Sequence, residues 1–215
     1  MPMLLDRFKN FKTMTKLMVG FSIIGVVIAI VGLLGVFGLQ QVREKLRVVY
    51  DNSTQSLAAL ASAANSLGLY HDSLLEASRA RTKVEFDVVV KPLDTRKSGT
   101  LEPITGLAGG QLRVSKSGRD ESRDQQALQD ALNAYFKAAD GVLSTVQDSL
   151  NPNYSEEQRE LFKELAATSV TTDVASRYSD ATKKLGEMVI SAREVAKDLN
   201  DEGQEIGRAS CRERV

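Results

Sequence analysis

The sequence has few of the residues on which most enzymes depend. Its 215 residues include one histidine, one cysteine and no tryptophan. A single histidine excludes a histidine-rich metal site, and a Ser-His-Asp triad could use only His71, which no nucleophile motif accompanies. Glycine-rich phosphate loops, G-x-S-x-G and H-E-x-x-H are also missing. The sequence therefore predicts a protein that is not an enzyme and needs no metal or cofactor.

Aromatic residues and basic patches are scarce as well. Aromatic residues make up 6% of the chain, and Ala, Leu, Ser, Asp and Glu dominate beyond residue 40. That mixture suits helices packed through small residues better than a sheet, so we expect an all-α fold. Lys and Arg number 28 against 28 Asp and Glu, without a basic stripe, which argues against nucleic acid as a partner.

The one cysteine, Cys211, lies in a C-terminal segment that does not look natural. Residues 206–215, IGRASCRERV, can be read in frame from ATC GGA AGA GCG TCG TGT AGG GAA AGA GTG, a sequencing-adapter sequence. We therefore interpret this segment as an artefact and exclude it from the fold. The remaining chain has no thiol, and so no disulfide or thiolate metal site. We also expect the natural chain to continue beyond Glu205, which makes this sequence a truncated fragment.

A long hydrophobic run stands near the N-terminus. Residues 17–39 are 23 consecutive residues without a charge. As a helix they would extend about 35 Å, whereas the hydrocarbon core of a bilayer is about 30 Å thick. We interpret the run as an uncleaved transmembrane helix, because it is too long for a signal peptide and lacks a small-x-small cleavage site. Gly25 and Ala29, four residues apart, predict a face for close helix packing.

The charges before this run predict its orientation. Residues 1–16 carry four basic residues and one acidic residue. Short basic flanks stay on the cytoplasmic side of a membrane. We therefore expect residues 1–16 inside the cell and residues 40–205 outside it, as one extracytoplasmic domain.

Apolar residues in residues 40–205 recur in alternating steps of four and three, which predicts long amphipathic helices. The first is expected to continue from the membrane helix through residues 40–91 and to end before Pro92. Residues 92–120 are expected to form a mobile, membrane-distal loop, with a short helix around residues 101–114 as the alternative.

Two further helices are predicted after this loop. One begins at residue 120 or 121 and ends near residue 151, and the next begins with a capping box formed by Ser155 and Gln158. The short connection makes them antiparallel neighbours. Within residues 155–205 the apolar spacing weakens at residues 168–173, which indicates either a bend or two helices. The expected architecture is an up-down bundle of the four-helix type.

Polar residues on the apolar seam of the first helix are the candidates for a binding site. His71 and Arg81 occupy seam positions, with Arg79 beside Arg81, and buried ionisable groups are unfavourable unless they are paired. Acidic residues on a facing helix could pair with them, or they could lie at a hydrated end of the bundle. Alternatively they line a ligand pocket in which an arginine binds a carboxylate or phosphate and Thr171 and Thr172 supply hydroxyls.

Two segments carry a resemblance to a known family. The basic sequence FKTMTKL at residues 11–17 leads into the glycine-spaced run, and VVYDNS at residues 48–53 leads into the first long helix. Together they resemble the N-terminal half of bacterial methyl-accepting chemotaxis proteins with a four-helix-bundle sensor domain. The resemblance implies a homodimer, a periplasmic sensor domain in the inner (cytoplasmic) membrane, and a second span followed by a HAMP linker and a methylated, kinase-controlling coiled coil.

Ligand specificity does not follow from this resemblance. In the family's amino-acid receptors, spaced arginines on the first sensor helix hold the ligand carboxylate. Here only Arg79 and Arg81 stand in that region, and residues two apart do not share a helix face. A specificity for aspartate or serine is therefore not transferred.

The expected function is that of the N-terminal sensory part of a transmembrane chemoreceptor. It would detect a small-molecule ligand, directly or through a periplasmic binding protein, and transmit a helix shift across the membrane. Kinase machinery would be reached only through the missing C-terminal part. Two alternatives stay open: the sensor module of a histidine kinase or diguanylate cyclase, and a membrane-anchored structural or interaction bundle without a ligand.

Overall fold

The computed structural model describes residues 18, 21–22, 24–33, 35–37, 40, 54–107 and 112–212, with the side chains of the last helix described to Glu205 except at residue 203. It divides into two compact units, Met1–Val48 and Val49–Val215. The described parts of the first unit are helical, and their large apolar side chains are exposed. Among the described residues, no helix combines the length and the apolar character that crossing a membrane requires. The predicted flank at residues 1–16 lies outside them, as do seven of the 23 residues of the predicted span at residues 17–39.

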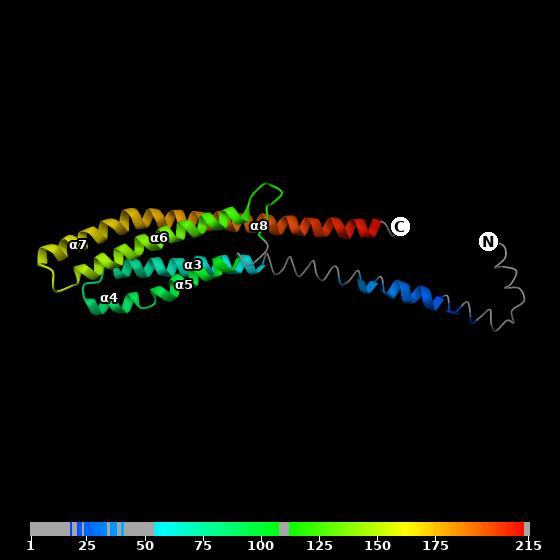
Figure 1. The fold of residues 1–215 in the computed structure, drawn as a ribbon, viewed down its shortest axis with the longest axis horizontal. Coiled ribbons are helices and arrows are strands. Elements are labelled where there is room, and N and C mark those ends of the chain that lie inside the picture. Colours follow the sequence, from blue (N-terminus) through cyan, green and yellow to red (C-terminus); the bar gives the residue numbers. More distant parts are fainter. Residues whose placement is uncertain are drawn as a thin grey trace, which may run out of the picture. The chain divides into compact units, whose positions relative to one another are not determined.

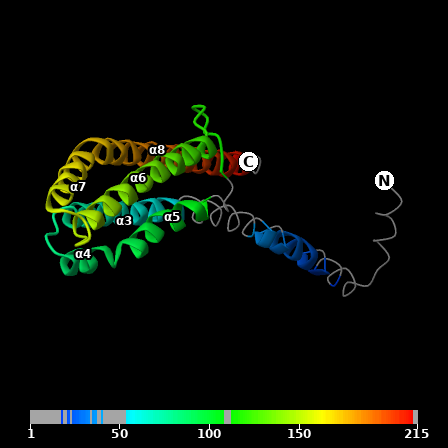
Figure 2. The same ribbon diagram turned by 60° about the vertical axis from the view of Figure 1, so that its left-hand side comes forward.

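The second unit is a four-helix bundle (Figures 1 and 2). In chain order its helices are α3 (Gln55–Ala77), α4 (Lys83–Val90), α5 (Leu93–Leu107), α6 (Glu121–Ser149), α7 (Glu156–Ser169), the π-helical turn η2 (Val170–Val174) and α8 (Ala175–Arg212). The chain runs along the bundle in α3, returns in α5, runs out again in α6 and returns through α7, η2 and α8. The all-α, up-down bundle predicted from the sequence is confirmed.

The predicted continuous helix over residues 40–91 is wrong. Residues 41–53 lie outside the described residues, and α3 ends at Ala77. Thr82 adopts an extended conformation (φ −129°, ψ 153°) and starts a new helix. Its hydroxyl accepts from the Glu85 amide at 3.2 Å, while the Glu85 carboxylate accepts from the Thr82 amide at 3.3 Å. This capping box stabilises a helix start where the apolar spacing alone predicted no interruption.

The predicted loop over residues 92–120 is also largely wrong, because most of it is α5. Pro92 is compatible with a helix start, since the first turn needs no amide from it, and its carbonyl accepts from the Arg96 amide at 3.0 Å. The Arg96 guanidinium donates to the Leu69 carbonyl at 2.9 Å and to the Ser73 hydroxyl. These bonds hold α5 against α3 as the fourth member of the bundle.

The two later helix starts are confirmed. Asp120 caps α6 by accepting from the amides of Ser122 and Arg123 at 2.9 and 3.4 Å. Ser155 and Gln158 form the predicted reciprocal capping box at the start of α7. Asp120 and Ser155 are both short polar residues with extended backbones, the conformation that leaves a side-chain oxygen free to accept from the first turn.

The structure resolves the ambiguity within residues 155–205. The helix continues without a break through a π-helical turn at Val170–Val174, and its direction changes between α7 and α8 (Figure 2). The apolar side chains of this stretch recur every four residues, and each step of four advances about 40° beyond a full α-helical turn. A wider turn corrects that drift. The side chains concerned, all buried or half-buried, are Phe162, Ala166, Val170, Val174 and Tyr178.

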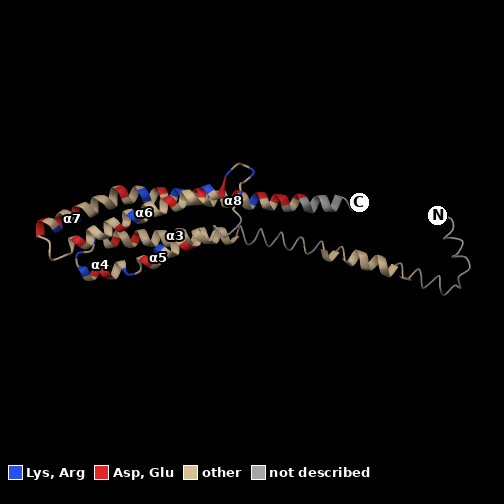
Figure 3. Cartoon of the chain, viewed as in Figure 1, with Lys and Arg blue, Asp and Glu red and all other residues tan. Residues whose placement is uncertain are grey.

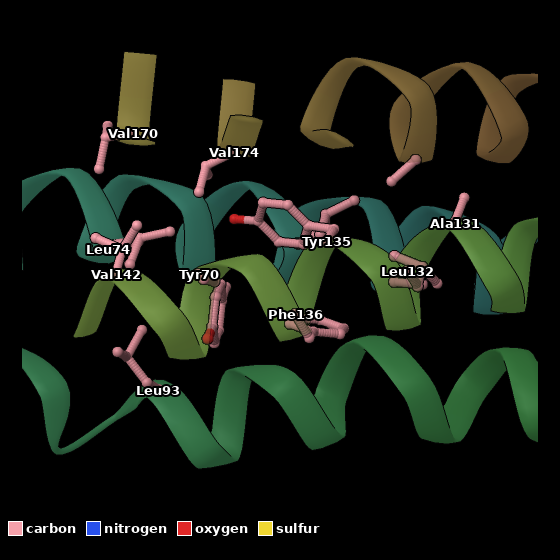
Figure 4. Packing of buried hydrophobic residues seen from close by; sticks show 14 of the residues in the cluster. Tyr70, Leu74, Leu93, Ala131, Leu132, Tyr135, Phe136, Val142, Val170 and Val174 are labelled. Carbon is pink, nitrogen blue, oxygen red and sulfur yellow. The ribbon is translucent and has the colours of Figure 1, made fainter. Parts of the chain in front are cut away.

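The core of the second unit forms where these seams meet. Large side chains such as Tyr70, Leu132 and Tyr135 are fully buried and alternate with alanines (Figure 4). The small residues let the helix backbones approach closely, as the composition predicts. The buried alanines are Ala63, Ala77, Ala131, Ala139, Ala166, Ala181 and Ala192.

The tight contact between α3 and α5 yields a stability prediction. A Cβ atom at Gly99 would lie 3.0 Å from the Ser66 Oγ atom, whereas one at Gly141 on α6 would meet nothing within 4 Å. We expect Gly99→Leu to lower the free energy of unfolding by about 1–3 kcal/mol, because the two helices must separate. Gly141→Leu is the matched control and is expected to be neutral or stabilising, since leucine favours helix. Urea unfolding of both variants measures the difference, and equal stabilities would contradict the prediction.

Candidate functional site

Three rings from three helices meet in the middle of the bundle. His71 on α3 stacks on Tyr178 of α8 with centroids 3.8 Å apart and planes 5° from parallel. The His71 Nδ1 atom is 3.1 Å from the hydroxyl oxygen of Tyr135 on α6. The centroids of the two tyrosine rings lie 5.7 Å apart. We call His71, Tyr135 and Tyr178 the His71 cluster, and it connects the first, third and last long helices.

Further aromatic rings support this cluster from the core side. Tyr70 lies edge-on to Phe136 at 4.9 Å and to Tyr135 at 5.9 Å (Figure 4). Tyr135 is fully buried, so its hydroxyl needs a partner, and the bond to His71 supplies one. The cluster is therefore a packed, hydrogen-bonded joint between helices.

The cluster is electrically neutral near pH 7. Burial lowers the pKa of His71, and the nearby charge of Asp72 opposes that shift only in part. Burial raises the pKa of Tyr135 and of Tyr178, and Asp72 raises both further. In the tautomer of the neutral ring that leaves Nδ1 unprotonated, the Tyr135 hydroxyl donates to Nδ1. A protonated ring has no acceptor, so proton uptake would reverse this hydrogen bond.

The η2 turn lies directly before the cluster. Val170 and Val174 are buried and point into the core, two turns and one turn before Tyr178 respectively (Figure 4). Thr171 and Thr172 point away from it, and their hydroxyls donate to carbonyls of their own helix, at Ala167 and Thr168. Such hydroxyls satisfy carbonyl groups that a π-helical turn displaces, and these turns occur frequently at functional sites.

The structure does not bring the predicted binding residues together. His71 is half-buried at the joint, whereas Arg79 and Arg81 are exposed in the turn between α3 and α4, because α3 ends before them. Thr171 and Thr172 are exposed on η2. In the part of the chain that the structure describes, no group of acidic, histidine or cysteine side chains could hold a metal ion.

The packing residues predicted in the hydrophobic run belong to the first unit. Gly25 and Ala29 are both exposed on a helical stretch, and a Cβ at Gly25 would meet nothing within 4 Å. Their proposed role in helix packing stays a prediction.

The apolar spacing does not pair Tyr135 and Tyr178 with His71, although the sequence holds a signal for both. Each occupies a seam position of a predicted helix, and the chain has only five tyrosines. A hydroxyl on a seam needs a hydrogen-bonding partner, and the single seam histidine is an obvious candidate. The sequence does not contain the distances between α3, α6 and α8, which bring the three side chains together.

Comparison with known proteins identifies the class. Residues 10–206 match the family described as a four-helix-bundle sensory module for signal transduction, and the chain belongs to that family. It is a family of sensory modules and not of enzymes. No curated protein and no solved structure matches the chain.

The single histidine permits a clean test of the cluster. Because the pKa of folded His71 lies below 6.5, the unfolded chain binds its proton first, and stability falls as the pH drops below about 6.5. We expect His71→Gln to lose this part of the pH dependence between pH 7.5 and 5.5, while its stability at pH 7.5 is also lower. Urea midpoints measured at several pH values test this, and parallel pH profiles for the two proteins would contradict it.

Proposed function

We propose that the chain is the sensory part of a bacterial transmembrane chemoreceptor of the methyl-accepting type. The observation that carries the proposal is the family match over residues 10–206, together with the two segments at residues 11–17 and 48–53 that resemble these receptors. The up-down order of the bundle adds support, because the start of α3 and the end of α8 lie at the same end of the second unit (Figure 1). In a receptor, that end would face the membrane.

The proposed placement puts residues 17–39 in the cytoplasmic membrane as a helix, residues 1–16 in the cytoplasm and the bundle in the periplasm. The support is the charge-free run and its basic flank. The distribution of charge agrees with it: Lys, Arg, Asp and Glu occur along the helices of the second unit, and the described residues of the first unit have none (Figure 3).

Transmission in this proposal is a movement of α8 relative to α3 and α6. A ligand that contacts these helices differently in two arrangements would shift the balance between them. The His71 cluster is a suitable joint, because it is the hydrogen-bonded and stacked contact between α3, α6 and α8. The η2 turn beside it provides a segment that can change between π-helical and α-helical geometry.

The proposed partners follow from the same role. They are a small molecule or a periplasmic binding protein on the outside, a second copy of the chain as a homodimer, and kinase machinery reached through a C-terminal part. A histidine kinase or diguanylate cyclase output is the alternative for that part. Arg79 and Arg81 are exposed at the far end of the bundle, which suits contact with a binding protein better than a pocket shared with His71.

Thermal unfolding of the full chain with a library of metabolites tests ligand binding. At one hundred times its dissociation constant a ligand adds about 2.7 kcal/mol to the stability, which raises the melting temperature of a domain of this size by about 5–10 °C. A hit should also change the output when residues 1–205 are joined to the signalling part of a chemoreceptor. If no metabolite raises the melting temperature and no binding protein is captured, the sensory role would be contradicted. The chain would then be better described as a structural or interaction bundle without a ligand.

A further inference from the structure

The connection between α5 and α6 ends in a rigid turn. Val114 and Asp120 pair as an antiparallel bridge, and the Ser115 amide donates to the Arg119 carbonyl at 2.8 Å. Gly118 closes the turn with φ at +90°, a conformation that residues with a side chain rarely adopt. We call residues 113–120 the clasp. Its internal hydrogen bonds fix where its side chains and amides lie.

The clasp binds two carboxylates of α8. The Ser117 and Ser115 hydroxyls donate to the Glu194 carboxylate at 2.5 and 3.4 Å, and the Arg119 Nε atom lies 3.4 Å from its other oxygen. The Lys116 amide donates to the Asp198 carboxylate at 2.6 Å. Glu194 and Asp198 are four residues apart, on one face of α8, so that one rigid turn holds two successive helical turns.

A second connection joins the same part of α8 to the start of α6. Arg119 lies 3.8 Å from the Asp124 carboxylate, which also accepts from the fully buried hydroxyl of Ser191. Asp124 is in the first turn of α6. The clasp, α6 and α8 therefore share one polar network near Val195, which is the last buried side chain among the described residues of α8.

The network differs in kind from the core beside it. Hydrogen bonds tolerate little change in distance or direction, and those to Glu194 and Asp198 all come from one rigid element. A slide of α8 by part of a helical turn would therefore break them together. The ion pairs are partly exposed, with 36–39% of the Arg119 and Glu194 side chains accessible, and such pairs contribute little stability singly. Breaking them is consequently much easier than unpacking the core.

We propose that the clasp is a latch that fixes the position of α8 along α6 in one signalling state and releases α8 in the other. Its part in signalling rests on the proposed sensory function, whereas the restraint on α8 does not. The natural occupant of the clasp is α8 itself, through Glu194 and Asp198. Release moves the helix that leaves the bundle, while the His71 cluster farther along α8 stays in the core.

Hydrogen exchange on the full chain tests the restraint. The variant Glu194→Ala/Asp198→Ala removes both carboxylates, and Glu202→Ala/Glu205→Ala is the matched control with the same charge change on the same helix. Glu202 and Glu205 are both exposed. We expect exchange of the amides in residues 113–119 and 190–201 to rise at least about threefold in the first variant only. Equal exchange in the two variants would overturn the latch, and unchanged protection of α3 would show that the bundle remains folded.

The same variants test the proposed role of the latch in signalling when they are placed in a hybrid receptor, in which residues 1–205 are joined to the signalling part of a chemoreceptor. We expect the clasp variant to shift the output without ligand, whereas the control keeps the output of the parent hybrid. Faster exchange with an unchanged output would overturn the latch as a signalling element. A parent hybrid whose output changes with no tested ligand would instead contradict the proposed sensory function. The hydrogen-exchange result would still test the restraint on α8.

Discussion

The structure depends on keeping one apolar seam of each long helix against a shared core. In α7 and α8 this is a geometrical problem, because five successive seam residues are spaced by four, and an α-helix would turn them progressively away. The π-helical turn at Val170–Val174 solves it and keeps Val170, Val174 and Tyr178 against α3 and α6. The stack of Tyr178 on His71 follows from that correction. The π-helical turn thus lies beside the histidine that joins α3, α6 and α8.

Polar contacts then divide the bundle into parts of different stability. The His71 cluster packs against the rings of Tyr70 and Phe136, and opening it removes the partner of the buried Tyr135 hydroxyl. The clasp on Glu194 and Asp198 is partly exposed and is more easily broken. A helix held firmly at its middle and lightly at one end can transmit a small displacement without unfolding. That property suits a sensory module, which must have two arrangements close in free energy.

The sequence was sufficient where a local signal decided the structure. The starts of α6 and α7 follow from Asp120, Ser155 and Gln158, and the all-α bundle follows from the apolar spacing. It misled where two local signals competed. The Thr82–Glu85 capping box starts a separate helix, α4, within the stretch predicted as one helix. The prolines and glycines of residues 92–107 favour a loop, but tertiary contacts stabilise a helix there. The His71 cluster needed the distances between helices, which no local pattern contains.

The central claim is that the bundle is carried outside the cytoplasmic membrane by residues 17–39. Alkaline phosphatase fused after Glu205 tests it most directly, because that enzyme becomes active only outside the cytoplasm. The account predicts that the phosphatase fusion is active and that green fluorescent protein fused at the same position does not fluoresce. Deletion of residues 17–39 should abolish the phosphatase activity. An inactive phosphatase with a bright fluorescent protein would contradict it.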